Sequence, residues 1–163
     1  KILFDYENDT LFVFNPYVEA MKNFEVKFLI NRDLNGQYLT RKNHDGSSTF
    51  VSNKISNGYY SFKTKSLGKF YVDYDTITPE IKRRNRVDHK KQIEYYILDK
   101  ETGIKNYVGK INDTWALFEY EPKLKKIFFK NDTLIRKNAV NKIEIKVEDM
   151  VGNSTTVIDS LKF

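Results

Sequence analysis

Two stretches of this chain decide its fold: residues 67–81 (LGKFYVDYDTITPEI) and residues 142–156 (KIEIKVEDMVGNSTT). In each stretch apolar and polar residues alternate, which is the pattern of a β-strand with one buried face. In the second stretch Ile143, Ile145 and Val147 share one face, and the Lys and Glu residues between them share the other. Each strand then runs into a turn. The sequence therefore predicts an all-β protein made of tandem β-sandwich modules.

Residues 75–79 are the predicted boundary between two modules, because Pro79 interrupts the strand pattern there. Residues 1–76 are predicted to form one β-sandwich module, with truncation at its N-terminus left open. Residues 77–163 are predicted to form an immunoglobulin-like or fibronectin-like sandwich, since about seven short strands with frequent turns fit into roughly 85 residues.

The predicted strands follow runs of β-branched and aromatic residues between Asn-, Asp- and Gly-rich turns. They are residues 11–14, 24–30, 37–42, 48–55, 59–65 and 69–74 in the first module, and 80–83, 92–99, 105–111, 114–120, 126–130, 142–148 and 155–163 in the second. Trp115 is predicted to be a core residue. Residues 132–139 are the one candidate for a helical turn.

Composition excludes several classes of function. The 163 residues contain no Cys, so no disulfide, thiolate metal site or cysteine nucleophile is available. The net charge is +6, but the Lys residues alternate with Glu, as on a solvated sheet face, and the dense run at 82–86 is predicted to be a soluble loop. Nucleic acid is therefore not an expected partner. No apolar run approaches the ~20 residues of a membrane-spanning helix. The chain begins with Lys1 instead of Met, so we expect it to be the C-terminal part of a longer protein.

Four segments, at residues 67–81, 103–112, 115–121 and 147–155, carry a family resemblance through their order and spacing. Over residues 35–163 the sequence resembles the C-terminal region of cell-envelope zinc metallopeptidases of the lysostaphin/LytM type from Bacteroidota. In that family a peptidoglycan-cleaving domain is followed by β-sandwich modules. Residues 99–103 depart from the family, which is richer in Asp there, so the resemblance does not imply a calcium site.

The catalytic motif of that family is not found in this sequence. The resemblance implies zinc held by a His-x-x-x-Asp pair and a His-x-His pair, but His44 and His89 belong to neither pattern. We predict no catalytic residue, no cofactor and no metal ligand for this chain, and we place any zinc in a preceding peptidase domain. Ser47 beside His44 is predicted to be a hairpin tip, and Glu119 and Glu121 are predicted to face solvent.

Residues 149–153 are predicted to form a structural turn. A carboxylate at this point, followed by glycine and asparagine, is suited to accepting backbone N–H bonds within the turn. Asp149 is therefore expected to accept such bonds, with Gly152 or Asn153 at positive φ, and not to bind a metal.

Asp followed by Ser or Thr and then by a hydrophobic residue occurs four times, and this resembles the O-glycosylation motif of exported Bacteroidota proteins. The candidate glycosylated residues are Thr10, Thr76, Thr133 and Ser160. The alternative is that Asp-Thr simply begins strands well, with Asp closing the turn and Thr opening the ladder.

The leading functional hypothesis is a non-catalytic accessory region of an exported cell-envelope protein, in the periplasm or at the outer-membrane surface, which docks an envelope protein partner. One alternative is a module that binds peptidoglycan or a surface glycan through exposed aromatic residues, for which the candidates are Tyr59, Tyr60, Tyr71 and Tyr74. Another is a scaffold subunit of an outer-membrane protein assembly. Fold alone does not choose among them, because sandwiches host many functions.

Overall fold

The computed structural model describes residues 4–7, 10–13, 19–29, 35–84, 93–130 and 133–163, and these residues are almost entirely β. The chain divides into two compact units, Lys1–Thr76 (unit 1) and Ile77–Phe163 (unit 2). The division falls inside the segment at residues 75–79. No helix among the described residues is long and apolar enough to cross a membrane.

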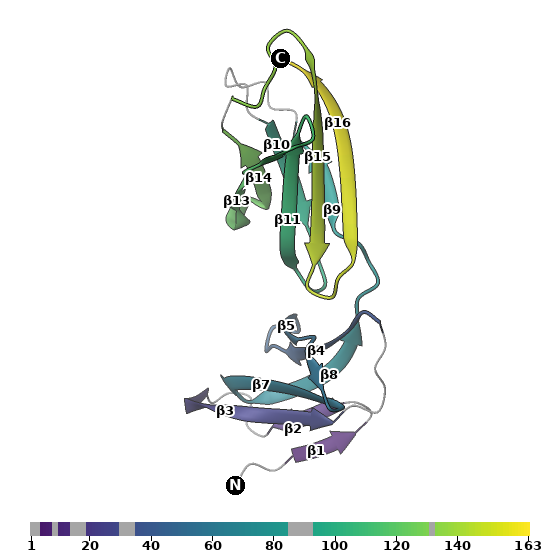
Figure 1. The fold of residues 1–163 in the computed structure, drawn as a ribbon. Coiled ribbons are helices and arrows are strands. Elements are labelled where there is room, and N and C mark those ends of the chain that lie inside the picture. Colours follow the sequence, from purple (N-terminus) through teal and green to yellow (C-terminus); the bar gives the residue numbers. More distant parts are fainter. Residues whose placement is uncertain (1–3, 8–9, 14–18, 30–34, 85–92, 131–132) are drawn as a thin grey trace. The chain divides into compact units, whose positions relative to one another are not determined.

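Unit 1 contains two antiparallel sheets (Figure 1), one with the order β1-β2-β8-β4-β5 and one with the order β3-β7-β6. Their strands are β1 (Phe4–Glu7), β2 (Thr10–Val13), β3 (Glu19–Leu29), β4 (Gln37–Lys42), β5 (Ser48–Ser52), β6 (Ile55–Ser56), β7 (Tyr59–Ser66) and β8 (Gly68–Tyr74). The two sheets enclose an apolar core made of Val26, Leu39, Tyr60, Phe62 and Phe70.

Unit 1 ends in a close backbone contact. Gly36, at φ +78°, accepts a hydrogen bond from the N–H of Asp75 at 2.9 Å, just beyond the last β4–β8 pair. A Cβ at position 36 would lie 2.4 Å from the carbonyl oxygen of Asp75. Only glycine fits both the positive φ and this approach.

Unit 2 is a sandwich of two antiparallel sheets, with the orders β13-β14-β10-β9 and β12-β11-β15-β16. Its strands are β9 (Glu80–Arg83), β10 (Ile93–Leu98), β11 (Ile104–Ile111), β12 (Thr114–Ala116), β13 (Glu119–Glu121), β14 (Lys126–Phe129), β15 (Val140–Asp149) and β16 (Ser154–Lys162). If β9 to β16 are lettered A, B, C, C′, D, E, F and G, the sheets read DEBA and C′CFG. This is the immunoglobulin arrangement, as the sequence predicted.

The core of unit 2 lies between the two sheets. Ile143, Ile145 and Val147 of β15 are fully buried, which confirms the face predicted for them, and they pack with Tyr95 and Ile97 of β10. Tyr95 donates its hydroxyl to Oδ2 of Asp159 on β16 at 2.7 Å. This bond joins the two sheets at one side of the sandwich.

A buried asparagine fixes the loop before β15. The Nδ2 group of Asn141 donates to the carbonyl oxygens of Arg136 (2.9 Å) and Ala139 (3.0 Å). Its Oδ1 atom accepts bonds from the N–H of Arg136 (2.8 Å) and from Nδ2 of Asn112 (2.9 Å). Asn141 thus satisfies loop groups that have no ladder partner.

Some sequence predictions need correction. Residues 48–55 form two strands, β5 and β6, and residues 114–120 also form two, which belong to different sheets. Residues 133–139 contain turns and no helix, while Asp132 lies outside the described residues. The one helical turn in the described part of the chain is the 3₁₀ helix η1 (Pro122–Leu124), where Pro122 supplies the φ of the first position.

The basic run at residues 82–86 is not simply a loop. Lys82 and Arg83 end strand β9, and the Arg84 guanidinium lies 5.6 Å from the ring centroid of Tyr96. Asn85, Arg86 and His89 lie outside the described residues, as do residues 14, 30 and 92, which the sequence places at strand ends.

Candidate interaction surface

Three large side chains are exposed along one segment of unit 2, residues 114–121. Trp115 and Leu117 each keep 63% of their surface exposed, and Tyr120 keeps 37%. The prediction that Trp115 is a core residue is therefore wrong. An exposed cluster of large apolar side chains is more informative than a single exposed leucine, because such clusters mark interaction sites. We take this segment as the candidate functional site.

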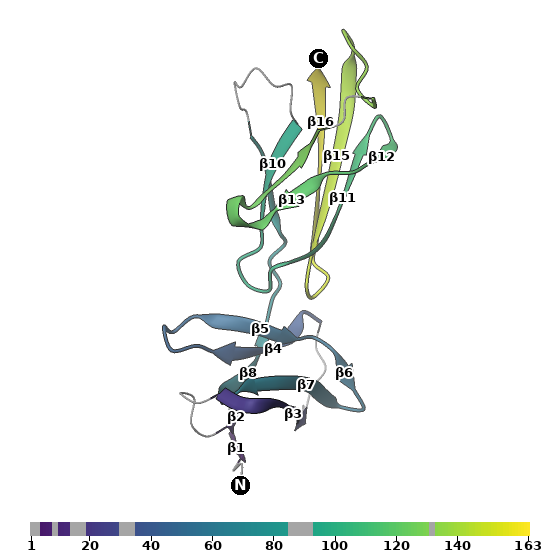
Figure 2. The ribbon, with the colours of Figure 1, turned by 90° about the vertical axis from the view of Figure 1, so that its left-hand side faces the viewer.

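The segment crosses from one sheet of the sandwich to the other. Figure 2 shows the chain running from β12, at the edge of one sheet, to β13, at the edge of the second. Ala116 and Phe118 are buried, while Trp115 and Leu117 between and beside them are exposed. From residue 115 to residue 118 the side chains thus alternate between solvent and core, with the period of an extended strand.

Phe118 anchors this crossing. Its ring centroid lies 5.5 Å from that of Phe129 and 6.5 Å from that of Tyr95. The ring also lies directly over Gly109 of β11, where a Cβ would come within 2.2 Å of it. A glycine inside a strand often marks such a close approach. Because Phe118 is fixed inward, its neighbours along the strand are fixed outward.

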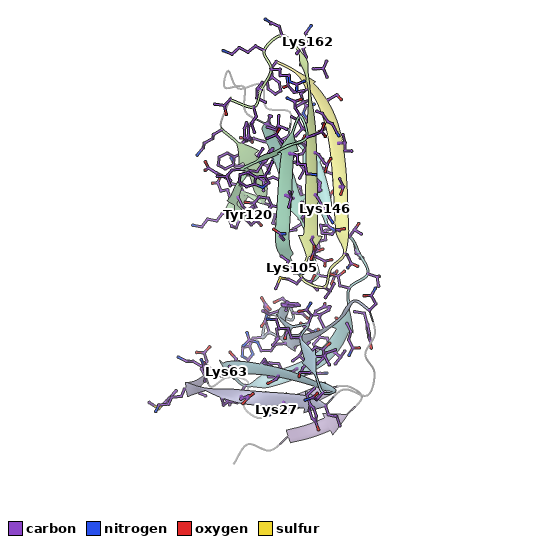
Figure 3. All side chains as sticks on the ribbon, in the orientation of Figure 1. Lys27, Lys63, Lys105, Tyr120, Lys146 and Lys162 are labelled. Atoms are coloured by element: carbon purple, nitrogen blue, oxygen red, sulfur yellow. The ribbon has the colours of Figure 1, made fainter. Side chains whose placement is uncertain are left out.

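Two tyrosines, Tyr107 and Tyr120, lie beside Phe118. Tyr107 of β11 donates its hydroxyl to the backbone carbonyl of Phe118 at 2.9 Å, and its ring lies 5.8 Å from that of Tyr120. Burial, followed by the neighbouring Tyr120, raises the pKa of Tyr107. Tyr120 belongs to β13, at the side of unit 2 (Figure 3).

A row of outward-facing residues crosses the sheet from Trp115. Trp115 pairs with Lys110, Lys110 with Glu144, and Glu144 with Ile158 of β16. Lys110 Nζ and Glu144 Oε1 are 3.4 Å apart, so the middle of the row is an ion pair. Ile158 is 59% exposed. The row therefore has an apolar side chain at each edge of the sheet and balanced charge between them.

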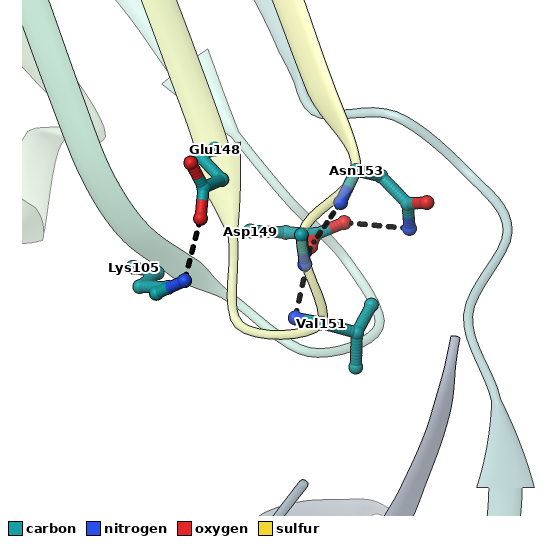
Figure 4. A network of polar contacts seen from close by, with 6 residues as sticks. Lys105, Glu148, Asp149, Val151 and Asn153 are labelled. Atoms are coloured by element: carbon teal, nitrogen blue, oxygen red, sulfur yellow. Dashed lines mark hydrogen bonds and ion pairs between the residues drawn. The ribbon is translucent and has the colours of Figure 1, made fainter. Parts of the chain in front are cut away.

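Further ion pairs lie on the same face. Lys105 pairs with Glu148, as Figure 4 shows, and Lys142 pairs with Asp113 at 2.7 Å. The hydrogen bond from Lys105 lowers the pKa of Glu148, and the one from Lys142 lowers the pKa of Asp113. Exposed pairs of this kind contribute little to stability. Each of these pairs balances its own charge on the face that carries Trp115.

The outer face of the other sheet carries a polar network that is mostly self-satisfied. Lys126 Nζ lies 3.6 Å from Oε1 of Glu94 and 3.3 Å from Oε2 of Glu121. Lys126 and Lys130 both lie over the ring of Phe128, at 4.9 and 4.8 Å from its centroid. Among the described residues Oε2 of the buried Glu94 has no hydrogen-bond partner. Lys126 thus pairs with both glutamates within this network.

The turn after β15 is organised by Asp149, which is fully buried (Figure 4). Its Oδ1 atom accepts the N–H groups of Val151 (2.9 Å), Gly152 (2.7 Å) and Asn153 (2.9 Å). Nδ2 of Asn153 donates to the other carboxylate oxygen at 2.8 Å, and Gly152 has φ +105°. The carboxylate thus replaces the missing ladder acceptors of the turn.

A second carboxylate organises the neighbouring loop in the same way. Oδ2 of Asp99 accepts the N–H groups of Thr102 (2.8 Å) and Gly103 (2.7 Å), and the N–H of Met150 donates to the carbonyl of Gly103 at 3.2 Å. The Asp99 and Asp149 carboxylates approach within 4.8 Å. Hydrogen bonds within the two turns hold both carboxylates in place.

The candidate glycosylation residues lie at separate places. Thr76, Thr133 and Ser160 are exposed, and Thr10 begins β2. Two of the Asp residues that precede these hydroxyl residues have structural roles. Asp75 is buried, and Asp159 accepts the hydrogen bond from Tyr95. The exposed hydroxyl groups are compatible with modification, and the bound acids are equally compatible with a structural role for the motif.

The four tyrosines considered for a glycan platform do not share an exposed face. Tyr60 is fully buried in the core of unit 1, and its neighbour Tyr59 is exposed on the opposite face of β7. Tyr71 is half-buried and shares a hydrogen bond with the Ser48 hydroxyl, while Tyr74 is exposed at the end of β8. Tyr60 is thus excluded as a contact residue.

The residues weighed for catalysis have structural partners. The Ser47 hydroxyl donates to Oδ1 of Asp45 at 2.6 Å, and this bond lowers the pKa of Asp45. His44 is exposed in the same turn. Glu119 pairs with Lys130 at 2.9 Å, and Glu121 pairs with Lys126 at 3.3 Å. These contacts account for each group as part of a turn or of an ion pair.

Sequence reasoning missed the exposure of Trp115, although a signal for it was present. Phe118 and Ala116 share one parity along the strand, and Trp115 and Leu117 share the other. Only one set can face the core, and Gly109 on the paired strand provides the space for Phe118. The prediction followed the general tendency of tryptophan to be largely buried, and not the alternation of these four residues.

No family model matches this chain, and a search of curated proteins finds no match.

Proposed function

We propose that this chain is a non-catalytic interaction region that docks a protein partner through Trp115 and Leu117. The observation that carries the proposal is the exposure of these two side chains on a segment whose backbone is fixed by the buried Phe118. Tryptophan is the residue most enriched at the energetic centres of protein interfaces.

The geometry supports binding by a preformed surface. The segment is held between two sheets, so docking requires little ordering of the backbone and loses little conformational entropy. The Lys110–Glu144 ion pair beside Trp115 is charge-balanced, which favours a partner with an apolar contact and a polar rim. The resemblance described above suggests that the partner belongs to the cell envelope and that the chain is an exported accessory region of a peptidoglycan metallopeptidase relative.

The test uses the exposed tryptophan directly. The full chain and its Trp115→Ala variant are immobilised and exposed to envelope extract, and retained proteins are identified by mass spectrometry. We expect one protein to be retained by the wild-type chain and lost by the variant. The matched control is Val140→Ala, which also removes an exposed apolar side chain from unit 2 and should retain the same protein.

A glycan is the second candidate ligand, because an exposed indole ring beside charged side chains also suits stacking on a sugar. Purified peptidoglycan incubated with both variants distinguishes the two functions. Retention of the wild-type chain and loss with Trp115→Ala would favour the glycan-binding module. If neither variant is retained by peptidoglycan or by any protein, the proposed docking function is wrong.

The envelope context has its own test, which is independent of Trp115. The intact mass and N-terminal sequence of the native polypeptide would show whether a His-x-x-x-Asp and His-x-His domain precedes Lys1. A mass above that of the polypeptide would indicate a glycan at Thr10, Thr76, Thr133 or Ser160. A native polypeptide without such a domain would remove the peptidase relationship from the proposal.

A further inference from the structure

Strand β16 differs from the other edge strands of unit 2. The strands β9, β12 and β13 have four, three and three residues, whereas β16 has nine. In the described part of the chain β16 pairs with β15 alone, over an unbroken register from Val140↔Lys162 to Glu148↔Ser154. Figure 1 shows β16 (yellow) running beside β15 at the side of the sheet. Proteins usually shorten, bend or cover such an edge.

Among the described residues, the start of unit 2 covers part of this strand, since β9 of the opposite sheet lies close to β16. The Thr155 hydroxyl donates to the carbonyl of Pro79 at 2.6 Å, which places the start of unit 2 beside this residue. Residues 156–162 lie beyond that contact, and they contain neither a proline nor a bulge. Asp159 turns its charge inward, but Tyr95 satisfies it. Over these residues, the part of the chain that the structure describes places no second strand in the ladder on the outer side of β16.

The ladder shows which backbone groups the edge offers. The N–H of Asp149 donates to the carbonyl of Asn153, so this pair is hydrogen-bonded across the hairpin. Hydrogen-bonded pairs alternate along an antiparallel ladder. Odd-numbered residues of β16 therefore bond to β15, and Thr156, Ile158 and Ser160 direct their N–H and C=O groups to the free edge.

We propose that this edge joins a second copy of the same chain, with two β16 strands pairing antiparallel about a two-fold axis through Ile158. In this register Ile158 faces Ile158 of the second copy, and Thr156 faces Ser160 in both directions. Each of these residues is one whose backbone groups point to the edge. The two exposed Ile158 side chains meet on the axis and leave water, which is the self-complementary contact of a two-fold interface.

Charge selects the register and the partner. With Ile158 on the axis, Asp159 faces Val157, and no charged residue faces a like charge across the new pair. The exposed Lys162 then faces Ser154, one strand away from Glu148 of the other copy. A register shifted by two residues, with the axis at Asp159, would place Asp159 opposite Asp159, which is unfavourable. The strand is thus charge-complementary to itself in one register.

Cysteine cross-linking tests the register, because the chain has no cysteine of its own. The full-length Ile158→Cys variant should form a covalent dimer under mild oxidation, since paired residues of neighbouring strands lie about 5.5 Å apart. A mixture of Thr156→Cys and Ser160→Cys should give the mixed dimer in excess over either symmetric one. Ser154→Cys is the control, because its two copies would lie roughly 26 Å apart at ~3.3 Å per residue.

Solution mass tests the association without a cross-link. Sedimentation of the wild-type chain over a range of concentrations should show a rise toward twice the monomer mass. The rise should be lost in Ile158→Lys, which places two charges on the axis, and kept in Leu124→Lys, which alters an exposed apolar residue of η1, outside this sheet. Unchanged circular dichroism and melting show that both variants fold. A chain that stays monomeric at every concentration, or equal cross-linking at 154 and 158, would overturn the proposal.

Discussion

The two edges of the sheet β12-β11-β15-β16 are held in different ways. The β12 edge is three residues long and is tied to the core through one buried ring, that of Phe118. The β16 edge is nine residues long and is held by a continuous ladder and by the turn around Asp149. One edge depends on apolar burial and the other on hydrogen bonds. The exposed side chains at each edge, Trp115 and Ile158, are free for a partner because other residues hold the strands.

The largest change in the free energy of unfolding is expected for a substitution at the β12 edge. Phe118→Ala removes the ring that fills the space over Gly109, and the cavity should lower the free energy of unfolding by about 3–5 kcal/mol. Urea denaturation followed by circular dichroism measures it. Leu117→Ala, one residue away and exposed, should change stability by no more than about 0.5 kcal/mol. Equal losses in the two variants would contradict the inward and outward assignment of this segment.

The next largest effect is expected at the β16 edge. Asp149→Ala leaves the N–H groups of the turn without their acceptor, and we expect a loss of about 2–3 kcal/mol. Asp149→Asn keeps one acceptor oxygen and should lose less. Urea denaturation of the three proteins gives the comparison. Because the bonds already occupy the carboxylate, adding calcium should leave the wild-type melting temperature unchanged, and a rise of several degrees would assign Asp149 to a metal site instead.

A smaller effect should report on the bond between Tyr95 and Asp159, which fixes β16 to the opposite sheet. Burial and then the bond to Asp159 raise the pKa of Tyr95 above its ordinary value of 10.0. In the unfolded chain the tyrosine ionises near that value, while the folded chain keeps the proton. The free energy of unfolding should therefore fall as the pH rises above about 10.

The matched variant for this test is Tyr95→Phe. It should be about 1 kcal/mol less stable than wild type at neutral pH, because the hydrogen bond is lost. It should also lose stability less steeply above pH 10, since residue 95 no longer ionises on unfolding. Denaturation midpoints measured from pH 7 to pH 11 show both changes. Parallel slopes in the two proteins would mean that Tyr95 is not the group responsible.

The smallest effect on stability is expected for Trp115→Ala, although this substitution should have the largest effect on partner docking. Trp115→Ala should change the free energy of unfolding by no more than about 0.5 kcal/mol, because the side chain is mostly in solvent. The same denaturation series measures it. A loss of several kcal/mol would show that the ring contributes to the core, and the proposed docking surface would then have no exposed tryptophan to present.

Much of the fold could be predicted from the sequence, because its strands show a clear period of two. The strands Gln37–Lys42 and Glu80–Arg83 have the predicted bounds, and the buried face of β15 follows from its alternation. The segment at residues 114–120 was harder. Four apolar residues follow one another at 115–118, so hydrophobic alternation does not tell which of them face the core, and the segment changes sheets midway.

The candidate site could be predicted only in part. Asp149 and Gly152 follow from local turn chemistry, which acts over a few residues. The exposure of Trp115 depends on Gly109 of the neighbouring strand, and the role of Asn141 depends on loop carbonyls brought close by the fold. Such contacts between separate segments are set by packing, and a single sequence does not display them.

The four hydrogen bonds of Asn141 have a consequence for local motion. Arg136 lies in a loop outside the ladder, yet its N–H donates to a side chain that is itself buried. Its amide hydrogen should therefore exchange with solvent about as slowly as those of the strands, because release requires the β15 end of the sandwich to open. A surface loop of unit 2 thus shares the protection of its core, through one amide side chain.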